Sequence, residues 1–448
     1  MGGGRYSFTP LWTDEGMNVL FRLTQAFLFI LPFQVALSPF SGVDLPISRI
    51  FSIILAVVYL TVSLSRRKVW IPFSPEALLL YSFLFFSLLS LLWAENTAWA
   101  IRRSTYFLTF LPLFIIYTSL LKEARRSLYR LAVPFVVGAG IAGLVGLFEF
   151  ASQYIFSVPV VFNFWITTIL PVFLGESFSA SVAAYPSLLV NVGGATILRA
   201  SAFFPDPHMA AFYFGISFPI AIYCYYESAV SSKKAVFGII AIIVLIADVL
   251  TFSRGGYVGL LSGLIVAISW YVSTLHIHHK NRLFLAVLVC MIVVGSLTVA
   301  PVRSRVLSVF STEDGSNLGR IEMYSEAIRN ITKQPWGYGL GNYSLAVKPT
   351  AEFREPIYAH NIYLDIATES GIPGALCVIL ALVSVLYRLI RRKDAVAYMG
   401  LVALSVFIGH SLFETPLYSV HVFPVFLLLL ALPYADRKNG SPVEQVCE

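Results

Sequence analysis

The feature that most constrains this chain is a repeated series of apolar runs, each about 18 residues or longer. A helix of that length crosses the hydrocarbon core of a bilayer. The candidate spans are residues 19–38, 47–64, 76–93, 105–121, 130–150, 207–227, 235–252, 256–272, 283–300, 364–388, 395–412 and 418–434. They predict an all-α polytopic membrane protein with about twelve transmembrane helices, which form a single transmembrane domain over residues 1–434.

The composition agrees with this fold class. Of the 448 residues, 58% are hydrophobic and 12% are charged, whereas soluble domains carry about a quarter charged residues. Disordered, collagen-like, coiled-coil and disulfide-rich classes are therefore excluded. The net charge of +7 does not indicate a nucleic-acid partner, because cytoplasmic loops of membrane proteins are ordinarily rich in Lys and Arg.

The basic clusters predict the orientation, because they recur after every second span. They lie near residues 66–68, 122–130, 233–234, 280–282, 388–393 and 437–438. By the positive-inside rule this side is cytoplasmic, and so are both termini, including the tail at 435–448.

Two long external loops follow from this orientation. The first, 151–206, contains the apolar segment 155–174, which we interpret as re-entrant or interfacial. The second, 301–363, lies between spans 9 and 10 and contains helical periodicity at 318–331, so we expect it to be large and structured.

Two arginines stand at the external ends of spans, on the side that is poor in positive charge. Arg199 precedes Asp206, Pro207 and His208, and Arg254 lies in a Ser-Arg-Gly-Gly turn. The planar guanidinium binds phosphate oxygens in pairs, so both are candidate anion ligands. The alternatives are an interfacial anchor for Arg199 and a helix cap for Asp206.

A histidine opens the predicted tenth span. His360 and Asn361 precede Gly371 and Gly374, which helical rotation would place near the face of His360. A lone histidine is more often structural, but one at a helix mouth beside external arginines is a candidate general base.

Other external residues are candidates for substrate binding. Trp336 and Tyr338 lie in a glycine-rich loop, which either packs over a sugar or a membrane surface or is tight for structural reasons. Arg320 belongs to the predicted helix at 318–331, and Glu414 flanks the last external turn.

These residues resemble the bacterial O-antigen ligase and polymerase superfamily, integral membrane glycosyltransferases that use polyprenyl-diphosphate-linked glycans. The ligase pattern is His-[Asn/Ser/Gln]-x9-Gly-x-x-[Gly/Thr/Tyr], and His360, Asn361, Gly371 and Gly374 match it in full. The resemblance departs at Pro207-His208, where many members have Pro-Asn.

The resemblance implies that an acceptor hydroxyl attacks the anomeric carbon of a glycan on undecaprenyl diphosphate, in the periplasm beside the inner membrane. His360 would be the base, and Arg254 and Arg199 would hold the diphosphate. Asn361, Arg320, Asp206, His208, Trp336, Tyr338 and Glu414 are the expected substrate-binding residues. The expected partners are this glycan donor, a lipid A core or other glycan acceptor, and membrane lipid. No cofactor and no metal are expected.

Two alternatives stay open from the sequence. A polymerase of the same superfamily would use another repeat unit as acceptor. A twelve-span transporter would share the number of spans, but it would not need these charges at the external mouth.

Overall fold

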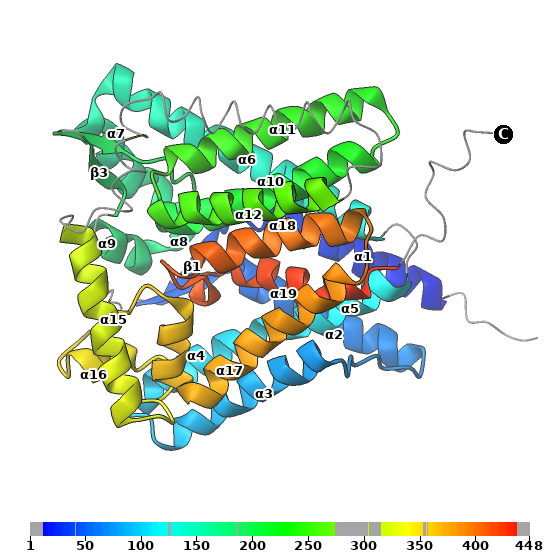
Figure 1. Ribbon diagram of the computed structural model, residues 1–448, viewed down its shortest axis with the longest axis horizontal. Coiled ribbons are helices and arrows are strands. Elements are labelled where there is room, and N and C mark those ends of the chain that lie inside the picture. The colour runs from blue at the N-terminus through cyan, green and yellow to red at the C-terminus, as the bar shows by residue number, and fades with distance from the viewer. Residues whose placement is uncertain are drawn as a thin grey trace, which may run out of the picture.

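The structure is a computed structural model dominated by helices that run alongside one another (Figure 1). It describes residues 12–40, 42–123, 127–184, 187–192, 194–273, 303, 315–352, 355 and 357–436.

The first half of the chain forms a row of helices and two short hairpins. Its elements are α1 (Trp12–Ile30), β1 (Ala36–Phe40), β2 (Val43–Pro46), α2 (Ile47–Ser65), α3 (Pro75–Leu89), η1 (Ser90–Leu92), α4 (Thr97–Phe110), α5 (Pro112–Glu123), α6 (Ser127–Phe156), α7 (Val158–Phe164), η2 (Trp165–Ile169), α8 (Leu170–Leu174), α9 (Glu176–Ala184), β3 (Leu189–Val192) and β4 (Ala195–Leu198). Both hairpins, β1–β2 and β3–β4, are antiparallel.

The second half supplies the elements that surround the candidate site. They are α10 (Pro207–Glu227), α11 (Ser231–Leu250), α12 (Arg254–Ser273), α15 (Gly315–Lys333), α16 (Tyr343–Val347), α17 (Ile362–Ile390), α18 (Ala395–His410), η4 (Pro416–Tyr418), α19 (Phe423–Ala431) and η5 (Leu432–Tyr434). Helix α12 packs on α18, α10 on α11 and α18, and α17 on α3. Helices α15 and α16 lie across one end of this bundle (Figure 1).

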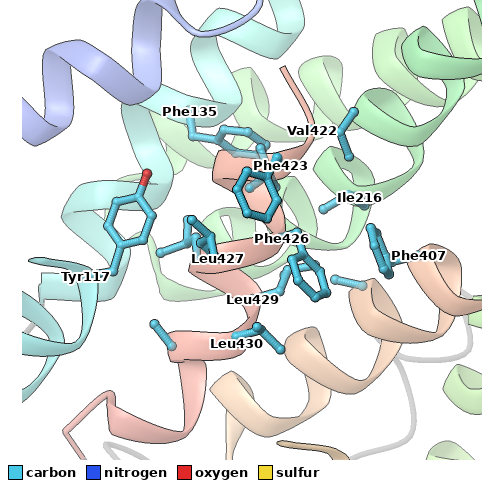
Figure 2. Packing of buried hydrophobic residues seen from close by; sticks show 14 of the residues in the cluster. Tyr117, Phe135, Ile216, Phe407, Val422, Phe423, Phe426, Leu427, Leu429 and Leu430 are labelled. Carbon is cyan, nitrogen blue, oxygen red and sulfur yellow. The ribbon is translucent and has the colours of Figure 1, made fainter. Parts of the chain in front are cut away.

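The core is built around α19, every residue of which is buried. Its side chains pack against Phe135 of α6, Ile216 of α10 and Phe407 of α18 (Figure 2). The rings of Phe407 and Phe426 stack with centroids 4.8 Å apart. Because α19 has only nine residues, it is too short to cross a bilayer alone, and its apolar composition reflects burial within protein.

The helices identify a polytopic membrane protein. Six described helices are long and apolar enough to cross a bilayer, namely Ile47–Ser65, Pro75–Leu92, Thr97–Lys122, Leu128–Phe156, Pro207–Glu227 and Ile362–Ile390. Shorter apolar helices include Arg254–Trp270 and Ala395–His410. Each of them overlaps an apolar run that the sequence singled out.

Several predicted helix limits are wrong. The first run, 19–38, leaves the helix after Ile30 and ends in β1. The fourth, 105–121, lies within the membrane-spanning stretch Thr97–Lys122, which begins earlier and is interrupted between α4 and α5 at Pro112, whose ring cannot continue the helical hydrogen bonding. The last, 418–434, starts at the end of the 3-10 turn Pro416–Tyr418, and its α-helix begins only at Phe423. The segment 155–174 is a chain of short helical pieces with a π-helical turn at Trp165–Ile169.

Helix α17 differs most from its prediction, because it is broken at Gly371. This residue has φ 78° and ψ 171°, and the pieces before and after it are separate helices that run in different directions (Figure 1). That backbone conformation is open essentially only to glycine. The expected common face of His360, Gly371 and Gly374 therefore does not exist, because no continuous helix connects them.

Some predictions fall outside the described residues. These are the ninth span at 283–300, the basic clusters at 280–282 and 437–438, and most of the loop segment 301–314.

Candidate functional site

His360 is joined to Glu414 by a short hydrogen bond. Its Nδ1–H donates to Oε1 of Glu414 over 2.6 Å, and the ring of Tyr358 lies 4.4 Å away, centroid to centroid. The His360 side chain is 24% exposed and that of Glu414 is 5% exposed. A carboxylate on Nδ1 fixes the proton there, so Nε2 carries the lone pair.

The backbone around His360 is held from both sides. His360 itself has φ 53°, a left-handed conformation that few non-glycine residues adopt. Asn361 caps the first piece of α17, because its side-chain oxygen accepts from the amides of Tyr363 and Leu364. Its Nδ2 donates to the carbonyl of Leu412. These bonds fix the histidine against the turn that carries Glu414.

A second acid ties the same two segments together. Asp365 accepts a hydrogen bond from the amide of Ala359 over 2.7 Å and another from the hydroxyl of Thr415. Asp365 is 1% exposed. It therefore links Ala359, which precedes His360, to Thr415, which follows Glu414, without reaching solvent itself.

The carboxylate also changes the charge of His360. Burial opposes the imidazolium, but the charge and hydrogen bond of Glu414 outweigh it and raise the pKa of His360 above its ordinary 6.5. Arg320 acts in the opposite direction. Proton uptake at this histidine is thus favoured by one neighbour and limited by another.

The Ser-Arg-Gly-Gly turn begins α12 in the wall of the same site. Ser253 Oγ accepts from the amide of Gly256 over 3.2 Å, as an N-cap does. Gly255 allows the close approach of α18, since a Cβ there would lie 2.4 Å from the His410 ring. Arg254 is only 2% exposed. It is packed among neighbouring side chains where the turn joins α11 to α12.

Arg199 braces the connection between α11 and α12. Its Nε donates to the carbonyl of Thr251 over 2.6 Å and its Nη1 to that of Ser187 over 3.0 Å. The loop that follows it is fixed by Glu149 of α6, which accepts from both the amide and hydroxyl of Ser201. Arg199 is 4% exposed, which is more consistent with a structural brace inside the wall than with an interfacial anchor.

Asp206 and His208 occupy the entry to α10. Asp206 caps this helix by accepting from the amides of His208 and Met209, each over 2.8 Å. Burial raises the pKa of the Asp206 carboxyl to about 6, and the charge of Glu414 acts in the same direction. The capping role considered from the sequence is what the structure shows.

Several charges converge on His208. Electrostatic interactions reach it from Arg199, Arg320, His410 and His360. Arg320 belongs to α15 and lies over the Phe413 ring at 5.7 Å. Helix α15 is held there by a hydrogen bond from the Tyr324 hydroxyl to the carbonyl of Leu412. The structure thus brings together six of the predicted residues, which come from separate parts of the chain: Arg199, Asp206, His208, Arg320, His360 and Glu414.

The glycine-rich loop forms hydrogen bonds with α17 at its break. The amides of Tyr338 and Gly339 donate to the carbonyls of Thr368 and Glu369, over 2.8 and 3.0 Å, and the amide of Ile372 donates to the carbonyl of Pro335 over 2.9 Å. These bonds satisfy backbone groups that a broken helix would leave without partners.

Glycines are required where this loop meets α17, because a side chain would clash with the opposite backbone. A Cβ at Gly337 would lie 2.4 Å from the carbonyl oxygen of Glu369, and one at Gly371 would lie 2.6 Å from the backbone of Trp336. The loop contacts α17 about 15 Å along the helix from Asn361. Trp336 is 63% exposed and Tyr338 is half-buried. Their contact with substrate remains a prediction.

The sequence did not single out Arg103 or Tyr358, and it noted Ser253 only as part of the Ser-Arg-Gly-Gly turn. Arg103 lies over the Tyr418 ring at 3.8 Å, and the Tyr418 hydroxyl donates to Glu369. The signal for Arg103 was available, because it is another arginine at the external end of an apolar run.

A cavity of about 380 Å³ lies elsewhere, between α1, α6 and α11, where Gln25, Arg130 and Lys233 line it. It contains none of the candidate site residues. Within the described part of the chain, no three His, Cys, Asp or Glu side chains gather in a group that could hold a metal ion.

The sequence of this chain matches a known protein family. The O-antigen ligase family model matches residues 239–379, about a third of the chain, including Arg254, Arg320 and the His360 motif. Residues 239–379 are therefore similar to the O-antigen ligase family. Members of the O-antigen ligase family are glycosyltransferase-like membrane enzymes that act on lipid-linked glycans. Arg199, His208 and Glu414 lie outside the matched segment. No curated protein matches the chain.

Proposed function

We propose that this protein is an O-antigen ligase-type glycosyltransferase of the bacterial inner membrane. It moves a glycan from undecaprenyl diphosphate to a hydroxyl of the lipid A core oligosaccharide, at the periplasmic face. The observation that carries this proposal is the His360–Glu414 pair, 2.6 Å apart, beside a group of cationic residues. A base next to cations is what transfer from an anionic leaving group requires.

The reaction is a single displacement at the anomeric carbon. The acceptor oxygen forms the new bond to that carbon while its proton moves to Nε2 of His360. The bond from the anomeric carbon to the diphosphate oxygen breaks, and the lipid diphosphate leaves with the electron pair. Glu414 holds the Nδ1 proton and stabilises the imidazolium that results.

The arginines act on the other side of the bond. Arg254 and Arg199 are the expected diphosphate ligands, with Arg320 at the α15 edge, because guanidinium groups bind phosphate oxygens in pairs. Asn361 and Asp206 fix the two helix entries through their capping bonds. Trp336 and Tyr338 are assigned to the more distant part of the glycan.

These cations can balance the developing charge without a metal. We therefore expect a chelator to leave transfer by the purified protein unchanged, measured with an extracted lipid-linked donor. A strict requirement for added Mg²⁺ or Mn²⁺ would contradict this part of the proposal.

The proposed topology has about twelve spans, with 151–206 and 301–363 in the periplasm and 435–448 in the cytoplasm. The basic clusters support it. Leu318 of α15, which is 48% exposed, offers a test. A Leu318→Cys variant without the native cysteines should react with an impermeant reagent added to spheroplasts, and protection would overturn the orientation.

Ligase and polymerase differ in acceptor. The full match at His360, Asn361, Gly371 and Gly374 favours the ligase. Deletion of the gene in a strain that makes the corresponding glycan, analysed on a lipopolysaccharide gel, separates the two. Loss of the whole ladder from the core indicates a ligase, whereas a core that bears one repeat indicates a polymerase. Unchanged ladders with altered solute movement in vesicles would indicate a transporter.

A further inference from the structure

Ser253 lies between two histidines. Its Oγ is 2.9 Å from Nδ1 of His208 and 3.3 Å from Nε2 of His410, and it also accepts from the amide of Gly256. A serine hydroxyl has one proton to donate and two lone pairs. With one lone pair used by Gly256, the hydroxyl must donate to one histidine and accept from the other.

Two proton arrangements satisfy this count. In the first, His208 donates from Nδ1 and the hydroxyl donates to His410, so His410 carries its proton on Nδ1. In the second, His410 donates from Nε2 and the hydroxyl donates to His208, so His208 carries its proton on Nε2. The arrangements give His208 opposite chemistry at Nε2, a lone pair in the first and an N–H in the second.

The surroundings of His410 select the second arrangement. His410 is 0% exposed, and its ring is stacked on Phe212 at 3.6 Å with a 5° angle between the planes. Its Nδ1 has no hydrogen-bond partner among the described residues. A buried N–H without an acceptor is rarer and more costly than an unused lone pair. Nδ1 of His410 therefore carries the lone pair and Nε2 the proton.

We propose that Ser253 and His410 lock His208 in the Nε2–H form, and that this N–H donates to a diphosphate oxygen of the glycan donor. The proposal rests on the proposed function and deepens it. No described residue forms a hydrogen bond with Nε2 of His208, and Arg199 and Arg320 act electrostatically on the same ring. A neutral donor to an anionic oxygen strengthens binding without giving up its proton. Ser253 and His410 are positioning residues, and His208 is the ligand.

The first test reads the tautomer directly. Solid-state NMR of the ¹⁵N-histidine-labelled protein in lipid, with the His208 signals assigned by comparison with His208→Gln, should show a neutral ring protonated on Nε2. Ser253→Ala should lose that preference, and Ser253→Thr should restore it. Ser262→Ala is the matched control, because this serine only donates to the Val258 carbonyl within α12. A wild-type His208 protonated on Nδ1 would overturn the proposal.

The second test measures donor use. A hydrogen bond to a charged group is worth about ten- to a hundredfold in affinity, so His208→Ala should raise KM for the lipid-linked donor by about that factor. His208→Gln can place its amide N–H near the position of Nε2 and should recover most of it, whereas the shorter side chain of His208→Asn should recover less. An unchanged donor KM in His208→Ala, or a shifted acid limb of the pH profile, would overturn the ligand role. If the wild-type protein transfers no glycan, the proposed function fails, while the tautomer is still decided by the spectra.

Discussion

The two histidines of the site are held by different kinds of partner. His360 meets a carboxylate, Glu414, which keeps the proton on Nδ1 and leaves a lone pair on Nε2. His208 meets a hydroxyl, Ser253, whose other contacts favour the reverse arrangement. We therefore propose that His360 acts as a base on the α17–α18 side and that His208 acts as a hydrogen-bond donor on the α10–α12 side. In this proposal the partner of Nδ1 decides which role the imidazole takes at Nε2.

The largest expected effect is the loss of the base. His360→Ala should lower kcat for glycan transfer by about 10²–10⁴-fold, with donor binding retained, because the arginine side of the site is untouched. His360→Gln retains hydrogen bonding at similar size and provides the discriminating variant. If it transfers glycan at nearly the wild-type rate, His360 is structural and the comparison of the two histidines fails.

The next effect concerns the anion side. Arg254→Lys should reduce kcat/KM by about ten- to a hundredfold, because lysine keeps the charge but cannot bind two phosphate oxygens at once. Transfer assays on purified protein with matched membrane levels measure this. Arg329→Lys is the control, since Arg329 is 64% exposed on α15 and pairs with Glu326. Equal activity of both variants would show that Arg254 contributes only its positive charge and does not bind two phosphate oxygens.

A smaller effect is expected from Glu414→Gln, which separates the two contributions of Glu414 to His360, its hydrogen bond and its charge. Its raised pKa keeps the imidazolium present above pH 6.5, so wild-type activity should rise as pH increases through that raised value. Glu414→Gln removes the charge that raises the pKa but can still accept from Nδ1. The acid limb of kcat/KM should move to lower pH. We also expect about a tenfold loss on the plateau, ~1.4 kcal/mol, because a hydrogen bond to a neutral amide stabilises the imidazolium less than one to a carboxylate. An unmoved limb would assign the limb to another group.

The smallest effect on the chemistry is expected from the helix break. Gly371→Ala should destabilise the fold by about 1–3 kcal/mol, because alanine is strained in this conformation and its Cβ would meet the backbone of Trp336. Thermal unfolding in detergent measures it. Gly319→Ala is matched, since nothing lies within 4 Å of a Cβ there, and it should instead stabilise α15 slightly. Equal stability of both variants would show that the break tolerates a side chain.

The fold class and some residues of the candidate site could be predicted from local sequence. Apolar runs report membrane helices because length and composition suffice. His360 and Arg254 could be predicted because an ionisable residue at the external end of a membrane span often has a functional role. The helix limits were less predictable, since the residues from Leu31 to the start of β1 are apolar enough to extend the first run.

The partners of these residues were not predictable, because they are distant in sequence. Glu414 lies 54 residues from His360, and His410 lies 157 residues from Ser253. No periodicity relates such positions. The break at Gly371 was hidden for the same reason, since it is stable only when the loop beginning at Pro335 supplies the missing hydrogen bonds.

The break at Gly371 also explains why the motif has nine residues between Asn361 and Gly371, because this number sets the distance and rotation between two fixed points. The first piece of α17 starts at the Asn361 cap and stops where the loop is inserted, so both of its ends are anchored to other parts of the protein. One residue more or less would turn the Asn361 end by about 100° and shift it by about 1.5 Å relative to Gly371. His360 would then no longer face Glu414. A spacer with two fixed ends does not tolerate a change of length.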